Sequence, residues 1–181
     1  ITAIDTDLSS VAGTHTTLAS ALATKTYVDN TRSGLEVKDS AVVATTANLS
    51  ATYANGSSGV GATLTNSGSQ AAIAIDGITL TSGQRVLVKD QSTASQNGLY
   101  KVSTVGDGST NWILIRTTDA DTASELSSGV FFFVEKGTAN FDNGYVMTQD
   151  TAISFGSTSI TFSQFSGAGQ ITAGNGLAKS S

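Results

Sequence analysis

Apolar side chains recur at alternating intervals of three and four residues along the first 25 residues of the chain. This spacing is that of a heptad repeat, in which the a and d positions form one narrow stripe on a helix. Leu at a positions with β-branched residues at d favours trimers or tetramers over dimers. We therefore predict a parallel, trimeric α-helical coiled coil over residues 1–25, with a trimer interface formed by Ile1, Ile4, Leu8, Val11, His15, Leu18 and Leu22.

The same segment is rich in Thr and Ser and contains Gly13, all of which are poor helix formers. An isolated helix of this length is not stable in water, so neighbouring chains must supply the stability. His15 lies within the stripe, where we expect a polar layer that fixes the register rather than a metal ligand or a catalytic base. The alternative is an amphipathic helix packed on the β domain of its own chain.

Residues 26–34 have the composition of a helix end and hinge, and the pattern then changes to short apolar or alternating runs. Turn signals such as Asp76-Gly77 and Asn97-Gly98 separate these runs. Strands are predicted at Leu35–Val43, Ala72–Ile75, Arg85–Lys89, Leu99–Val105, Trp112–Arg116, Val130–Glu135, Tyr145–Thr148 and Ser159–Phe165. Because no long helical pattern alternates with them, we predict a mainly β domain over residues 35–166, an antiparallel sandwich or open barrel. A Gly-rich linker to a further module is expected at residues 167–181.

Three segments within the β-rich region refine this expectation. Asn48–Ser69 contains few large apolar residues and is predicted to be a long loop, whereas Asp121–Ser128 is predicted to form one helical turn. Phe131, Phe132 and Phe133 are consecutive, so in a strand their side chains point to both faces of the sheet. We expect the domain core to cover one face and a subunit interface to cover the other.

The composition excludes several classes of function. The chain has 181 residues, a net charge of −5, 13% charged residues and no Cys. It therefore has no disulfides and no thiolate chemistry, and it lacks the basic surface that nucleic-acid binding requires. No apolar run approaches the roughly 20 residues of a membrane span, so no membrane insertion is expected.

Residues with catalytic or binding chemistry are scarce. The one His falls in the predicted seam, and no group of His, Cys or carboxylate residues has metal-ligand spacing, so we expect no catalytic residue, no metal and no cofactor. Asp119, Asp121 and Glu125 are close in sequence and could bind calcium, or could cap a turn and face solvent. Tyr100, Trp112 and Tyr145 are candidates for stacking on a host-surface glycan, with core packing as the alternative.

Four runs of the sequence resemble segments frequent in tail-fibre and related virion proteins of tailed bacteriophages. These runs are ALATKTYVDNTRSGLEVKDSAVVATTANLS, IDGITLTSGQRVLVKDQSTASQNGLYKV, IRTTDADTASELSSGVFFFVEKGTANFDNGYVMTQD and ITFSQFSGAGQITAGNGL, and together they cover most of residues 21–177. The resemblance implies a virion structural protein, usually trimeric, built as one of several modules in a line. It supplies no catalytic residue.

The expected function is therefore a structural module of a tail fibre or related virion appendage, a homotrimeric rod that links the virion to a distal host-recognition tip. Its expected partners are copies of itself and other tail or baseplate proteins, and the absence of Cys suits assembly in the reducing cytoplasm of the host bacterium. The alternative function is a receptor-binding module that contacts a host-surface glycan. A depolymerase and a bacterial trimeric adhesin stalk are more distant alternatives.

Overall fold

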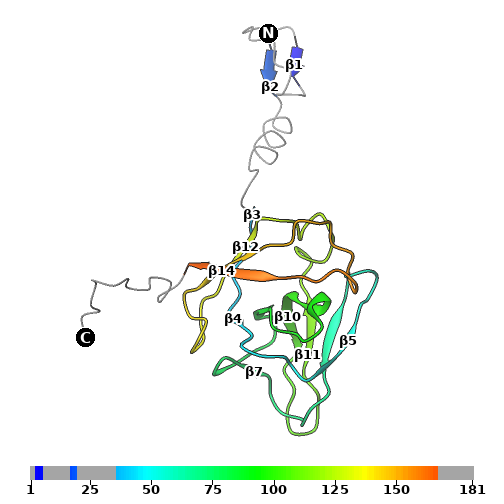
Figure 1. Ribbon diagram of the computed structural model, residues 1–181, viewed down its shortest axis with the longest axis vertical. Coiled ribbons are helices and arrows are strands. Elements are labelled where there is room, and N and C mark those ends of the chain that lie inside the picture. The colour runs from blue at the N-terminus through cyan, green and yellow to red at the C-terminus, as the bar shows by residue number, and fades with distance from the viewer. Residues whose placement is uncertain (1–2, 6–16, 20–35, 167–181) are drawn as a thin grey trace, which may run out of the picture. The chain divides into compact units, whose positions relative to one another are not determined.

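The structure is a computed structural model that describes residues 3–5, 17–19 and 36–166 (Figure 1). Its contacts divide the chain into two units, Ile1–Glu36 and Val37–Ser181. In the first unit, β1 (Ala3–Asp5) and β2 (Thr17–Ala19) form a parallel pair in which Ile4 lies opposite Leu18.

These strands occupy positions where the heptad spacing predicts helix, so the coiled coil over residues 1–25 is not shown. The physical reason is that a Thr- and Ser-rich segment gains little from a helix that has no neighbour, whereas its β-branched residues are favourable in strands. The other predicted seam residues, Ile1, Leu8, Val11, His15 and Leu22, lie outside the described residues, as do the hinge at 26–34 and the linker at 167–181.

The second unit contains two larger sheets and a short hairpin. The six-stranded sheet has the order β4-β9-β10-β11-β6-β5, the four-stranded sheet has the order β14-β13-β12-β3, and β7 pairs with β8. The bounds of these strands are β3 (Glu36–Val37), β4 (Val43–Ala44), β5 (Ala51–Ala54), β6 (Thr63–Asn66), β7 (Ala74–Ile75), β8 (Ile78–Thr79), β9 (Arg85–Val88), β10 (Gly98–Thr104), β11 (Ile113–Arg116), β12 (Val130–Phe133), β13 (Gly144–Met147) and β14 (Phe162–Ser166).

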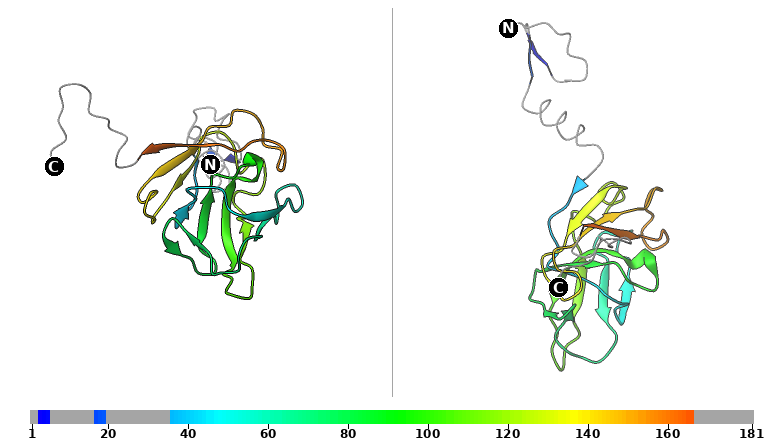
Figure 2. Two further views of the ribbon diagram at one scale, coloured as in Figure 1. Left: turned by 60° about the horizontal axis from the view of Figure 1, so that its bottom comes forward. Right: turned by 60° about the vertical axis from the view of Figure 1, so that its left-hand side comes forward.

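The six-stranded sheet is covered on both of its faces. Along β9, Leu87 points to a core shared with the four-stranded sheet, whereas Val86 and Val88 point to a second core on the opposite face. Residues of the β7–β8 hairpin, such as Ile75, contribute to that second core. Both views of Figure 2 show the yellow and orange strands of the four-stranded sheet on one side of the green strands of the six-stranded sheet. The continuous apolar run in β9 follows from this burial on two faces.

The segment between β3 and β4 crosses from one sheet to the other. Ala41 forms a parallel bridge with Val134 of the four-stranded side, and its N–H donates to Phe133 O at 2.8 Å. Two residues later, Val43 pairs in parallel with Val86 of β9. The prediction of a mainly β domain is confirmed, but the expectation of purely antiparallel sheets is wrong, because this crossing segment pairs in parallel with both.

Most of the predicted strands are present, including those around β9, β10, β11, β12 and β13. The prediction of a loop over Asn48–Ser69 is wrong, because β5 and β6 lie within it and pair with each other, and β6 also pairs with β11. The predicted Asp76-Gly77 turn is confirmed: it joins β7 to β8 with φ of 49° at Asp76 and 79° at Gly77, as a tight hairpin turn requires.

Candidate interface and buried polar network

The four-stranded sheet exposes an apolar face on the side away from the shared core. Side chains of β12 alternate, so that Val130 and Phe132 are fully buried, while Phe131 is half-buried and Phe133 is 38% exposed. The three consecutive phenylalanines therefore point to both faces of the sheet, as the sequence predicts. Phe132 packs edge-on against Phe162 in the core, with ring centroids 5.6 Å apart.

Neighbouring strands extend this apolar face. Phe165 of β14 is 50% exposed, and its ring meets Phe131 edge-on with centroids 4.5 Å apart. Val146 of β13 lies opposite Phe131 in the ladder and is half-buried. Val37 on β3, at the sheet edge beside β12, is 62% exposed. We call Phe131, Phe133, Val146 and Phe165, with Val37 at their border, the outer face.

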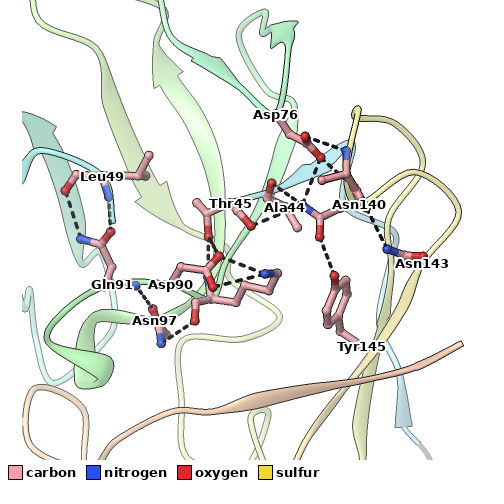
Figure 3. Close-up of polar contacts among 12 residues, drawn as sticks. Ala44, Thr45, Leu49, Asp76, Asp90, Gln91, Asn97, Asn140, Asn143 and Tyr145 are labelled. Atoms are coloured by element: carbon pink, nitrogen blue, oxygen red, sulfur yellow. Dashed lines mark hydrogen bonds and ion pairs between the residues drawn. The ribbon is translucent and has the colours of Figure 1, made fainter. Parts of the chain in front are cut away.

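Asn97 is the centre of a polar network that lies between the sheets (Figure 3). Its side-chain N–H groups donate to Lys89 O at 3.1 Å and Ile160 O at 3.0 Å, and its side-chain oxygen accepts from Gln91 N at 2.9 Å. Gln91 in turn accepts from the N–H of Leu49 at 2.7 Å. These bonds satisfy backbone groups that would otherwise be buried without partners.

Asn140 makes a similar connection elsewhere in the domain. Its side chain donates to Ala44 O and Thr45 O at 3.3 and 3.4 Å, and accepts from the Tyr145 hydroxyl at 2.5 Å (Figure 3). Asp76, at the tip of the β7–β8 hairpin, accepts from the backbone N–H of Asn140 at 2.8 Å and from its side chain at 3.0 Å. The loop that follows β12 is thereby attached both to β4 and to the hairpin.

The charge of Asp76 strengthens this attachment. Partial burial raises the pKa of its carboxyl, but backbone hydrogen bonds from Ala139 and Asn140, with the Asn140 side chain, together hold the pKa below its usual value. The carboxylate is therefore the form that the folded domain favours.

Arg116 is a buried cation stacked between aromatic rings. It is 1% exposed, and its guanidinium lies 4.7 Å from the ring centroids of both Tyr100 and Phe155. It donates to Asn97 O at 3.1 Å and to the Tyr100 hydroxyl at 2.8 Å. Burial raises the pKa of Tyr100 far above its usual value, even though the nearby Arg116 charge lowers it. Tyr100 is thus a neutral hydrogen-bonding partner of the cation.

The three aromatic residues considered for glycan stacking are core residues. Tyr100, Trp112 and Tyr145 are 0%, 9% and 5% exposed, so the core-packing alternative is confirmed for each of them. They offer no ring face to a sugar at the surface. The exposed aromatic side chains instead lie on the outer face, which the sequence indicated only through the phenylalanine triplet.

The acidic residues considered for calcium have separate structural roles. Asp119 forms an ion pair with Arg85 at 2.7 Å. Glu125 accepts from the Thr122 N–H at 3.0 Å and from the Thr122 hydroxyl at 2.7 Å, so its carboxylate stabilises a turn between these two residues. The segment Asp121–Ser128, predicted to be a helical turn, forms bends and turns rather than a helix. Within the part of the chain that the structure describes, no three metal-ligating side chains are grouped.

Two surface hollows formed by described residues have few groups suited to catalysis. One, of about 350 Å³, lies between residues 123–128 and 149–153, and Asp150 is the one carboxylate in its lining. A smaller one of about 130 Å³ lies beside Thr45 and Asp76. Neither supplies the pair of carboxylates that glycoside hydrolysis requires.

Among residues 3–5, 17–19 and 36–166, no helix has both the length and the apolar character needed to cross a membrane. Comparison of the chain with protein-family models, curated proteins and solved structures found no match.

Proposed function

We propose that this chain is a structural module of a bacteriophage tail fibre or related virion appendage, not an enzyme, and that it acts as a homotrimeric rod between the virion and a distal host-recognition tip. The observation that carries the proposal is the outer face, on which Phe133 and Phe165 are exposed and Phe165 packs against the half-buried Phe131. Contiguous exposed apolar side chains on a small domain mark an interaction surface.

The polar interior of the domain supports a mechanical role. Asn97 and Asn140 bond to backbone groups of several segments, and Asp76 attaches the hairpin to the loop after β12. Polar side chains that are held in such contacts cannot bind a ligand without disrupting the fold. They do make the relative position of the two sheets well defined, which is what a spacer needs to transmit geometry.

The heptad stripe supports association into trimers. In the proposal, Leu8 and the apolar stripe to which it belongs bring three chains into parallel register, and neighbouring chains supply the stability that a Thr- and Ser-rich segment lacks alone. The resemblance of four sequence runs to phage fibre segments supports the assignment to a virion appendage, with tail or baseplate proteins as further partners. The glycan-binding alternative is not carried further, because its three aromatic candidates are buried.

The first test is the mass of the full chain in solution. Mass photometry at micromolar concentration and below is expected to give a species of three times the chain mass of 18.3 kDa. Leu8→Asp is expected to reduce that species, because a charge in the seam must be desolvated on assembly. A folded monomer at every concentration would refute the trimeric rod.

The second test addresses the location. Antibodies raised against the folded domain of residues 36–166 are expected to label an appendage of tailed particles produced by cells that encode the chain. Label that is absent from purified particles, or confined to cell lysate, would refute the assignment to a virion.

A further inference from the structure

We infer that the outer face is the surface through which the β domains of three copies contact one another around a common axis. This inference rests on the proposed homotrimer and names the contact that the domain contributes to it. The occupant of the face is therefore a second copy of this chain, rather than a sugar or an unrelated protein.

The path of the chain through the four-stranded sheet is the first argument. β12 and β14 are both antiparallel to β13, so β14 runs in the same direction as β12. The segment that begins with β3 also runs parallel to β12, as the bridge between Ala41 and Val134 shows. The strand by which the chain enters this sheet and the strand by which it leaves thus run in the same direction along its two edges.

The entry and exit points consequently lie toward opposite ends of the sheet. Lys38, just after β3, bonds to Phe131 O near the start of β12. Ser166, the last residue of β14, pairs with Gly144, which lies opposite Phe133 at the end of β12. A chain that enters a sheet at one end and leaves from the other end suits modules arranged in series. The strand direction of this sheet then follows the axis of the rod.

The distribution of exposed apolar side chains is the second argument. Phe133, Phe165 and Val37 gather on this sheet, whereas Val60 and Phe141 are exposed singly on loops. Aromatic side chains are enriched at protein interfaces, where they bury a large area with few rotatable bonds. The loop residues Val60 and Phe141 provide matched controls of similar exposure.

Charge and edge pairing form the third argument. The side chains of the outer face carry no charge, so copies of an acidic chain can meet there without desolvating an ionised group. Within the described residues, β3 and β14 are the edges of the sheet, with no further strand beyond either of them. Contact between β14 of one copy and β3 of the next is a head-to-tail contact, which three copies can close into a ring.

Cysteine cross-linking tests the contact directly, because the natural chain has no Cys. A full-length chain carrying both Val37→Cys, on β3, and Phe165→Cys, on β14, is expected to form disulfide-linked dimers and trimers under mild oxidation, because the head-to-tail contact brings these two edges of neighbouring copies together. A chain carrying both Val60→Cys and Phe141→Cys is the control and is expected to remain uncross-linked at the same low protein concentration. Cross-linking equal to that of the control would overturn the inference.

Substitution by a charged residue gives a second readout. Phe165→Asp is expected to raise the concentration at which the trimer dissociates by roughly tenfold or more, as loss of an aromatic anchor at an interface does. Phe141→Asp is expected to change it less than about twofold, since rim and surface positions contribute little. A trimeric wild type whose dissociation is unchanged by Phe165→Asp refutes this contact and leaves the rod intact. A monomeric wild type refutes the rod itself, and the inference with it.

Discussion

Replacing Asn97 by Ala tests whether the buried polar network holds the two sheets in their relative position. Asn97 is 2% exposed, and its amide bonds to Lys89 O, Ile160 O and Gln91 N over 3.1, 3.0 and 2.9 Å. Lys89 directly follows β9 of the six-stranded sheet, and Ile160 precedes β14 of the four-stranded sheet. A single side chain therefore joins the two sheets.

The expected loss of stability follows from these three bonds. A net contribution of about 1 kcal/mol for each of the two hydrogen bonds that Asn97 donates, with about 1–3 kcal/mol for the buried Gln91 N–H left without a partner, predicts a loss of roughly 3–5 kcal/mol in the free energy of unfolding. The donor left without an acceptor is the backbone N–H of Gln91, which is itself a buried residue. For a chain of this size the loss corresponds to a decrease of roughly 6–20 °C in Tm.

Urea unfolding measures the effect, because the sole Trp, Trp112, lies in the core and reports on it by fluorescence. All variants are compared at one protein concentration, since association adds to apparent stability. The matched control is Asn48→Ala, which removes one bond to Leu49 O and one from Ser92 N at exposed positions and is expected to cost about 1 kcal/mol. Equal losses in the two variants would refute the role assigned to Asn97.

Two further variants test other parts of the domain. The pKa of Asp76 is lowered by folding, so its carboxylate stabilises the domain fully above the unfolded pKa of about 3.8, and this contribution is lost as the pH falls through the folded value. Asp76→Asn should therefore be less stable than wild type at pH 7, and this difference should shrink as the pH falls below about 3.8; a difference that stays constant or grows on acidification would contradict this. Gly98→Ala should cost roughly 2–4 kcal/mol, because φ is +143° and a Cβ would lie 2.0 Å from the buried Arg116 Nη1, whereas Gly108→Ala, with open space around it, should be near neutral in the same urea assay.

Sequence patterns correctly predicted the strands that carry large apolar residues on at least one face. Val86, Leu87 and Val88 form a continuous run because the six-stranded sheet is covered on both sides. β5 and β6 were missed because Thr and Ala occupy most of their positions, and only Tyr53 and Leu64 mark their alternation. β6 is a strand because it pairs with the distant β11, and β5 is a strand because it pairs with β6, so neither is marked by its local sequence.

The polar network could not be predicted, because its bonds join residues far apart in the chain. Asn97-Gly98 was interpreted as a hairpin turn, which is the usual meaning of that pair. In the structure a 3-10 turn at Ala94–Gln96 changes the chain direction, and Gly98 begins β10. The role of Asn97 depends on Ile160, a residue 63 positions away, which no local pattern reveals. The same reasoning applies to Asn140 and Ala44.

The phenylalanine triplet connects sequence, fold and proposed function more directly than any other segment. Three consecutive aromatic residues in a strand require two covered faces, and the structure accounts for one of them through the burial of Phe132. Phe131 and Phe133 lie on the other face, where Phe165 adds a third ring. A spacer that had to remain monomeric would gain solubility from polar residues at these positions at no cost to its core. Aromatic residues at these positions are instead explained by a surface that identical copies cover on assembly.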